Sequence, residues 1–417
     1  MYVADSRAST SAQGAVRPSA GRRRAALAPT VLALGTVSLV TDVSSEMVTA
    51  VLPLYLVTGL GLSPLGFGLL DGIYNGFSAL VRLVGGHLAD RGGGRHKWVA
   101  GLGYAVSAVC KPLLLVAHSL TPIGVVLAAD RTGKGLRTAP RDALISLSST
   151  PETRGRAFGV HRAMDTAGAL LGPLVAFLIL RATVDGYDAV FTVSFCVAVL
   201  GVLVLVLFVP GGRRGPVPAE RPTLRAAFAL LRRRDLRRIT GCALLLGLAT
   251  VSDSFVYLLL QRRLGVPDRW FALLPLGTAA AFLLLAVPLG RLADRVGRWP
   301  VFLAGHGALL LAYGLLLTSW HGTLLPGLVL ALHGGFYAAT DGVLMAAASD
   351  SVPDALRSSG LAVVQTGQAL TRFACSLLFG AAWTVWGDRA ALAGAAAALA
   401  ACAAFSLTLR PKGPVPA

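Results

Sequence analysis

The sequence is poor in charged residues. Aspartate, glutamate, lysine and arginine make up 14% of its 417 residues, whereas about a quarter of an average soluble chain is charged. Hydrophobic residues reach 55%, and the mean hydropathy is +0.68. This scarcity of charge excludes an ordinary soluble domain and indicates a protein of the lipid bilayer.

Cysteine is scarce as well. The five cysteines all lie within apolar stretches without the spacing of a metal site, so we expect free, buried thiols and no disulfide. They are Cys110, Cys196, Cys242, Cys375 and Cys402. The sequence also lacks a nucleophile beside a base and a cluster of metal ligands. Its glycine run at residues 92–94 lacks the strand-to-helix context of a nucleotide loop. These absences argue against an enzyme, a metal site and a bound cofactor.

Acidic residues are outnumbered, 20 against 38 basic ones, which gives a net charge of +18. In a soluble protein such an excess suggests nucleic acid as a partner. Here the arginines crowd into short loops between apolar segments. The excess therefore carries information about membrane topology, and we expect no nucleic acid partner.

Apolar segments of about 20 residues, enough to cross a bilayer, occur twelve times. An even number of spans puts both termini on one side, and the basic loops and tails share that side, so we expect both termini in the cytoplasm. This predicts an all-α, multi-pass protein of a bacterial cytoplasmic membrane. The spans lie near residues 28–57, 64–88, 97–118, 122–147, 157–181, 189–209, 238–262, 268–292, 300–319, 324–347, 359–384 and 388–409.

The spans divide the chain into five parts. Residues 1–26 are rich in serine, alanine and arginine and have no apolar core, so we expect a disordered cytoplasmic tail. Residues 27–209 and 238–409 hold six spans each. Between them, residues 210–237 form a basic cytoplasmic linker whose amphipathic end suits the anionic inner leaflet; a regulatory role is the alternative. Residues 410–417 form a second cytoplasmic tail.

The two groups of six spans echo each other. Gly86-His87-Leu88-Ala89-Asp90-Arg91 is nearly repeated as Gly290-Arg291-Leu292-Ala293-Asp294-Arg295. Thr41-Asp42-Val43 in the first span likewise resembles Ser252-Asp253-Ser254 in the seventh. Both echoes fall at an offset of about two hundred residues. Such a duplication predicts two pseudo-symmetric six-helix halves with a cavity between them at mid-membrane.

The repeated loop, G-x-L-A-D-R-x-G-R, resembles the cytoplasmic loop signature of the major facilitator superfamily. Its glycines allow two helix ends to approach closely, and its arginines suit the cytoplasmic side. The first copy has one extra residue before its last arginine. The resemblance implies a role in conformational switching for Gly86, Asp90, Arg91 and Arg95 in the first copy, and for Gly290, Asp294, Arg295, Gly297 and Arg298 in the second.

Two further motifs resemble the same superfamily. In the fourth span an arginine is followed four residues later by a glycine, and the resemblance associates that arginine, Arg131, with proton transfer. In the fifth span Gly168, Gly172 and Pro173 are similar to the G-x-x-x-G-P motif of the family's antiporters. Small residues four apart allow close helix packing, and a proline bends a helix. The family implies the major facilitator fold and a monomer.

Ionisable residues within the spans are the candidates for function, because charge in lipid is costly unless it is paired or hydrated. Asp42 and Glu46 share one helix face. Asp42, near the middle of its span, is the favoured acid for proton coupling or substrate contact, with Glu46 second; a static salt bridge to helix 2 or 4 is the alternative. Most of the basic candidates lie in the first half, so we expect the working polar groups there. The set is Asp42, Glu46, Asp71, Arg82, Arg131, Lys134, Arg137, Arg141, Asp165 and Asp253.

The fourth span carries four cations on one face, from Arg131 to Arg141. They could bind an anionic substrate, hold a water-filled path, or neutralise the acids of helices 1 and 2. In the second half, His333, Asp341, Gln365, Gln368 and Arg372 could line the wall of the cavity. The aromatic residues Tyr55, Tyr74, Tyr257, Tyr337 and Phe336 could stack on a flat or cationic ligand, although packing is their commoner use.

The favoured function is a proton-driven antiporter that exports small organic molecules by rocking its halves about a central site. The stretches at 41–47 and 137–142 also resemble a bacterial, drug/proton-antiporter-like branch of the superfamily. One alternative is a carrier for an anionic metabolite that uses the cationic face of helix 4. Another is a transporter-like sensor with no net flux. We expect a small-molecule substrate, membrane lipids as neighbours, the proton gradient as energy source, and no cofactor.

Overall fold

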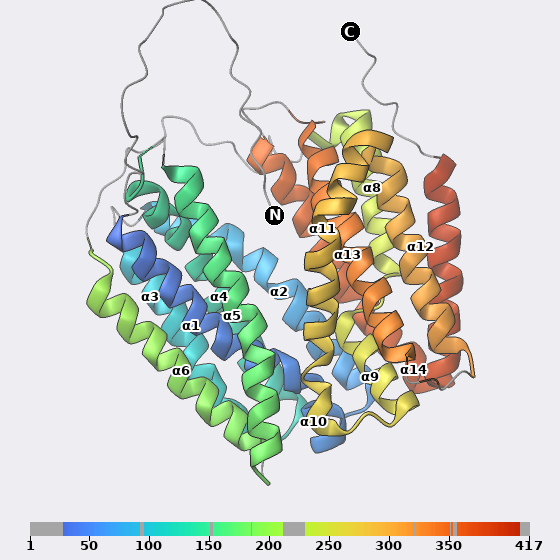
Figure 1. Cartoon of the computed structure of the whole chain (residues 1–417), viewed down its shortest axis with the longest axis horizontal. Helices are drawn as coiled ribbons and strands as arrows, with labels where there is room; N and C mark the ends of the chain where they lie inside the picture. The colour runs from blue at the N-terminus through green and yellow to red at the C-terminus, as the bar shows by residue number, and fades with distance from the viewer. Residues whose placement is uncertain are drawn as a thin grey trace, which may run out of the picture.

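The computed structural model describes residues 28–91, 96–150, 153–184, 186–211, 230–319, 322, 324–350, 352 and 357–408. In these residues the chain is built from helices and contains no strand. The helices form two groups side by side (Figure 1). The predicted tails at 1–26 and 410–417, and most of the predicted linker, lie outside the described residues.

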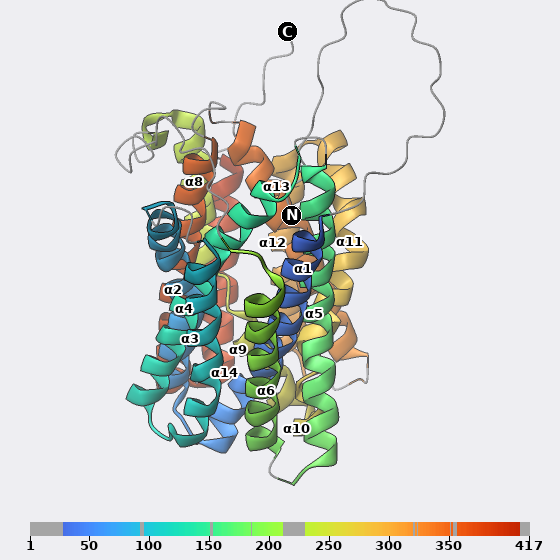
Figure 2. The same ribbon diagram turned by 90° about the vertical axis from the view of Figure 1, so that its left-hand side faces the viewer.

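The N-terminal half contains six long helices. They are α1 (Pro29–Leu54), which a short π-helical segment η1 (Tyr55–Gly59) extends, α2 (Pro64–Arg91), α3 (His96–Val116), α4 (Leu120–Leu147), α5 (Arg154–Ala182) and α6 (Gly186–Phe208). Helix α1 packs on α5 and α6, and α4 packs between α2 and α3. Figure 2 shows α6 beside α1, α3 and α5 on the outer face of this half.

The C-terminal half begins with a short 3-10 turn, η2 (Leu230–Arg232). It continues with α8 (Arg234–Leu248), α9 (Asp253–Leu264), α10 (Asp268–Phe271), α11 (Leu274–Val296), α12 (Arg298–Leu317), α13 (Leu325–Asp350) and α14 (Arg357–Thr408). Gly387, with a φ of 83°, interrupts α14 and divides it into two membrane-crossing segments. Helix α13 packs on α11 and α12, and α14 packs on α8 and α12.

Nine helical segments among the described residues are long and apolar enough to cross a membrane. The last of them, Val363–Thr408, contains both crossings of α14. Helices α2 and α4 pack against these segments and complete the predicted set of twelve crossings. The fold is therefore the all-α, two-half bundle that the sequence predicts.

One span differs from the prediction. The sequence predicts one continuous helix over 238–262, but the helix is broken at residues 249–252, between α8 and α9. The amide of Val251 donates a hydrogen bond to the Tyr313 hydroxyl over 2.7 Å, which satisfies one backbone group that the break frees. Irregular backbone is tolerated at membrane depth where it is buried in protein or lines a cavity.

The two halves meet along a seam of glycines between α2 and α14. A Cβ atom on Gly68 would lie 2.4 Å from the Ser376 carbonyl oxygen, and one on Gly380 would lie 2.5 Å from that of Pro64. Only glycine permits such close contact of two helix backbones. The seam joins the start of α2 to the middle part of α14, away from the membrane face on which α1 begins and α14 ends.

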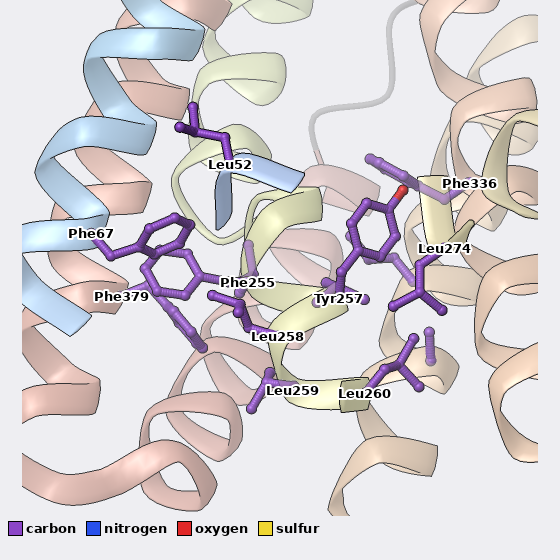
Figure 3. Packing of buried hydrophobic residues seen from close by; sticks show 14 of the residues in the cluster. Leu52, Phe67, Phe255, Tyr257, Leu258, Leu259, Leu260, Leu274, Phe336 and Phe379 are labelled. Carbon is purple, nitrogen blue, oxygen red and sulfur yellow. The ribbon is translucent and has the colours of Figure 1, made fainter. Parts of the chain in front are cut away.

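Aromatic side chains continue this contact between the halves. Phe255 of α9 packs edge-on against Phe67 of α2 and against Phe379 of α14, with ring centroids 4.8 and 4.9 Å apart (Figure 3). Near the far ends of their helices, Phe177 of α5 and Trp270 of α10 lie 5.1 Å apart. The halves are thus closed against each other on the face opposite the start of α1.

Candidate functional site

A cavity of about 380 Å³ lies between the two halves. Helices α1 and α2 contribute to one wall, and the break at 249–252 together with α9, α10, α11, α13 and α14 forms the rest. Its size is that of a pocket for a small organic molecule. The polar side chains that line it are Glu46, Thr49, Tyr74, Asn75, Thr250, Ser252, Asp253, Ser254, Tyr257, Thr278, Tyr337, Asp341 and Arg372.

Asp253, in the first turn of α9, lines the cavity and is held by two hydrogen-bond partners. His333 Nε2 lies 3.0 Å from its Oδ1 atom, and the Tyr337 hydroxyl donates a hydrogen bond to the same oxygen over 2.5 Å. The side chain of Asp253 is 40% exposed, whereas that of His333 is fully buried behind it. The carboxylate therefore faces the cavity, and its protein partners hold it from the back.

Arg372 and Asp341 bring one charge of each sign to the same cavity. Both residues are exposed and line its wall, Arg372 from α14 and Asp341 from α13. Arg372 lies within electrostatic reach of both Asp341 and Asp253. This agrees with the prediction that they line the cavity. His333 lies behind Asp253 instead, and neither Gln365 nor Gln368 is among the lining residues.

On the N-terminal side, Glu46 is the one carboxylate among the described lining residues. Its Oε1 atom lies 3.6 Å from Lys134 Nζ, and both side chains are partly exposed. Tyr74 lies beside it, hydrogen-bonded to Thr49, and the Arg131 guanidinium lies 3.8 Å from the Tyr74 ring centroid. The wall of this half is thus polar and aromatic, with its acid already paired.

Asp42 does not line the cavity. Its Oδ1 atom accepts a hydrogen bond from Arg137 Nη2 over 3.2 Å, and both side chains are buried. Asp42 therefore forms a salt bridge with helix 4 in this conformation. A carboxylate that contacts a substrate needs access to the cavity, and in this conformation Glu46, one turn further along α1, has that access.

The other cations of α4 are paired as well. Arg131 binds Asp130, with Nε 3.0 Å from Oδ2, and Lys111 Nζ lies 3.8 Å from the same carboxylate. Arg141 lies 3.6 Å from Asp165 on α5 and 3.1 Å from its neighbour Asp142. Each of the four cations on this face therefore has a carboxylate partner. The partners lie on α1, on α5 and on α4 itself, whereas the sequence prediction paired these cations with acids of helices 1 and 2.

Asp71 lies in the interface between the halves. It is buried on α2, and its Oδ2 atom accepts a hydrogen bond from the Ser376 hydroxyl of α14 over 2.6 Å. The Phe67–Phe255–Phe379 cluster lies about one turn away along the same helices. Asp71 thus takes part in the contact that closes the halves.

The second glycine loop is described, and the first is not. Gly297, with a φ of 99°, joins α11 to α12 in a backbone conformation that favours glycine. A Cβ on Gly290 would meet open space, so close approach is not the reason for glycine there. Asp294 and Arg295 are exposed at the end of α11, and Arg298 begins α12. Arg95 and the side chains of Arg82, Gly86, Asp90 and Arg91 lie outside the described residues.

The helix 5 motif packs on the part of α1 that carries Asp42 and Glu46. A Cβ on Gly168 would lie 2.4 Å from the Leu39 carbonyl oxygen, and one on Gly172 would lie 2.7 Å from the Glu46 Cβ atom. Pro173 is buried inside α5. The two glycines therefore bring α5 directly against α1.

Sequence reasoning expected the working polar groups in the N-terminal half, but most of the cavity wall is C-terminal. It did not find Thr49, Asn75, Ser254, Phe271, Thr278 or Phe282, because single small polar or aromatic residues are common in membrane helices. It also did not pair Asp253 with His333. The duplication could have indicated this pair, because α13 is the fourth span of the C-terminal half and so corresponds to α4, the fourth span of the N-terminal half.

Comparison with known proteins agrees with this geometry. The sequence model of the Major Facilitator Superfamily matches residues 34–376. An uncharacterized MFS-type transporter of Methanocaldococcus jannaschii is 30% identical over 370 residues, which cover 86% of this chain and 89% of that protein. The chain therefore belongs to the Major Facilitator Superfamily and is a multi-pass membrane transporter, not an enzyme.

Solved structures share the fold. The nucleoside transporter NupG superposes with a TM-score of 0.78 at 13% identity, over 91% of this chain and 98% of that one. A bacterial homolog to the human lysosomal transporter Spinster, inward-facing and occupied, gives 0.73 at 16% identity, over 91% and 96% of the chains. At such low identity the likeness concerns the fold alone.

Proposed function

We propose that this secondary transporter is a proton-coupled antiporter that exports small organic molecules from the cytoplasm. The observation that carries the proposal is the cavity between the halves, into which Asp253, Glu46 and Asp341 bring carboxylates from both sides. A carboxylate that faces water in one conformation and protein in another can take up and release a proton as the halves move. Binding and proton exchange can then compete at one place.

The closed seam between α2 and α14 supports alternating access. The halves touch by backbone along this seam, and α1 and α5 also contact α9, α10 and α11 of the other half. We place the start of α1 in the cytoplasm, in line with the basic loops, so that this conformation faces inward. The protein would act as a monomer in a bacterial cytoplasmic membrane and draw on the proton gradient without a cofactor.

The structure favours this proposal over a carrier for anionic metabolites. That alternative needs free cations on the face of α4, but Arg131, Lys134, Arg137 and Arg141 are each paired with a carboxylate. Arg372 is the guanidinium among the described lining residues, and two carboxylates lie within its electrostatic reach. The described lining residues therefore carry no excess of positive charge with which to hold an anion.

The test is proton flux in proteoliposomes. Purified protein is reconstituted with a pH-sensitive dye inside, a proton gradient is imposed, and panels of organic cations, neutral molecules and organic anions are added in turn. We expect at least one panel to drive proton movement that empty liposomes do not show. Substrate uptake that ignores the gradient, or flux of proton and substrate in the same direction, would overturn the antiport assignment.

A further inference from the structure

We propose that the cavity binds organic monocations with Asp253 as their counter-ion, and that a proton held by the Asp253–His333 pair leaves when the cation enters. The inference rests on the proposed function and assigns its substrate class and its exchange site. It makes Asp253 a substrate-binding residue and His333 the residue that positions it and shares its proton.

The charges that line the cavity single out Asp253. Glu46 has Lys134 at 3.6 Å, and Asp341 has Arg372 within electrostatic reach. Asp253 shares that influence of Arg372, but its direct hydrogen-bond partners are His333 and Tyr337. Neither partner carries a permanent charge. Three carboxylates thus face two permanent cations among these described residues, and Asp253, whose side chain is 40% exposed, is the carboxylate without a close permanent cation.

His333 is positioned to share a proton with the Asp253 carboxylate. Its ring is fully buried, and Nε2 lies 3.0 Å from Asp253 Oδ1. Its Nδ1 atom is buried without a hydrogen-bond partner among the described residues. The pair can therefore hold one proton, on Nε2, or two, and the second proton can reach it through the exposed carboxylate.

The exchange conserves charge at every stage. With two protons, the Asp253–His333 pair is neutral and the cavity is empty. When a monocation binds, one proton passes from the pair to cavity water, leaving an ionised carboxylate beside a neutral imidazole. The pair with its bound cation is again neutral. No other group changes its protonation, and the low-dielectric interior encloses no net charge in either state, which avoids the cost of burying one.

Other titratable and charged groups lie on the helices packed around the pair. Tyr257 of α9 faces the His333 ring at 6.3 Å and donates its hydroxyl to Thr278 of α11. His306 of α12 is separated from His333 by the ring of Phe336 and bonds to the Phe302 carbonyl. The remaining titratable or charged groups nearby are Tyr337 and Asp341 on α13, Arg372 on α14, Asp71 on α2 and Glu46 on α1.

The aromatic lining suits an organic cation. Rings from both halves, including Tyr74, Tyr257, Phe271 and Phe282, surround the space in front of Asp253. Aromatic faces attract cations, most strongly when water is displaced. A molecule with a delocalised or quaternary positive charge and flat hydrophobic groups would satisfy the rings and the carboxylate at once. An inorganic cation would leave the rings unused.

The test is binding of tetraphenylphosphonium, ethidium and N-methylquinolinium to the purified full-length protein, with salicylate as an anionic probe. Titration calorimetry in two buffers of different ionisation enthalpy counts the protons released. We expect at least one cation to bind the wild type with release of about one proton. Binding to Asp253→Asn should be roughly 30-fold weaker or more, as expected when a partly buried charge loses its counter-ion, and without proton release.

His333→Gln separates positioning from binding. Glutamine can still donate a hydrogen bond to Asp253 but cannot titrate, so cation binding should persist while proton release is lost. His306→Gln is the matched control, because His306 is an equally buried histidine without a carboxylate partner. It should release as many protons as the wild type. Equal proton release by His333→Gln, failure of the wild type to bind any of the three cations, or tighter binding of salicylate overturns the inference.

The proposed function can fail separately. If proteoliposomes exchange protons for a neutral or anionic molecule, and Asp253→Asn does the same, the antiport proposal stands and the cation site falls. If no molecule drives proton movement, the antiport proposal is wrong. Cation binding to the detergent-solubilised protein, accompanied by proton release, would still support the proposed site.

Discussion

The two halves carry the same acid in different surroundings. Asp42 on α1 and Asp253 on α9 lie in similar short sequences of the first and seventh spans, and each is bonded by a residue of the fourth span of its half. In the N-terminal half the partner is Arg137 and both side chains are nearly enclosed, 13% and 4% exposed. In the C-terminal half the partner is His333, and the acid is 40% exposed.

Under the proposed exchange, Asp42 has a structural role and Asp253 takes part in proton transfer. A guanidinium stays protonated at all ordinary pH values, so Asp42 has a permanent cation beside it, and the salt bridge ties α1 to α4. An imidazole can gain or lose a proton, so the Asp253 pair can change charge. Under the proposed exchange, the N-terminal half keeps a permanent cation beside its acid, and the C-terminal half carries the pair that gains and loses a proton.

The largest effect is expected when the more exposed of the two acids, Asp253, is neutralised. Asp253→Asn should lower substrate-driven proton flux in proteoliposomes by about 100-fold, because the substrate loses its counter-ion and the pair loses its proton. Asp188→Asn, at an exposed acid on α6, is the control and should retain the wild-type rate. Retained flux in Asp253→Asn would show that the two acids are not divided in this way.

Neutralising the enclosed acid should act on stability instead. Asp42→Asn leaves the buried Arg137 without its carboxylate, and we expect a loss of about 3 kcal/mol in stability, seen as a lower apparent melting temperature in detergent. The double variant Asp42→Asn, Arg137→Gln should recover much of that loss and retain proton coupling. A stable Asp42→Asn protein that has lost coupling would return Asp42 to the role that the sequence first suggested.

The pH dependence of cation affinity should also distinguish the Asp253–His333 pair from the Asp42–Arg137 pair. Protons compete with the cation at the Asp253 pair, so cation affinity should rise as pH increases across the range in which the protein stays folded. In His333→Gln the rise should be flatter, whereas Arg137→Lys, which keeps a permanent charge beside Asp42, should follow the wild-type curve. The measurement is equilibrium binding of tetraphenylphosphonium across this range, and an affinity that falls with pH would contradict the exchange.

The smallest effect is expected at Glu46. This acid faces the cavity but is balanced by Lys134, and partly exposed ion pairs contribute little. Glu46→Gln should change cation affinity by about threefold or less. A loss as large as that of Asp253→Asn would show that both walls supply counter-ions, and the division between the halves would fail.

The sequence predicted the bundle well because its signals are local. Apolar length set the twelve spans, and the repeat offset aligned Asp42 with Asp253. The rotation of each helix about its axis is not local, because it depends on packing against neighbours. Asp42 therefore turned to Arg137, and Glu46 turned to the cavity. The break at 249–252 carries no proline or glycine to announce it, and its stability depends on Tyr313, 62 residues away.

The glycine seam has a consequence for inhibition. Helices α2 and α14 meet backbone to backbone, and the Phe67–Phe255–Phe379 cluster lies against them. A molecule that recognises the cavity in this conformation must therefore arrive from the face where α1 begins. A membrane-impermeant blocker of this state would be one-sided: active when applied to one surface of an oriented membrane and without effect from the other.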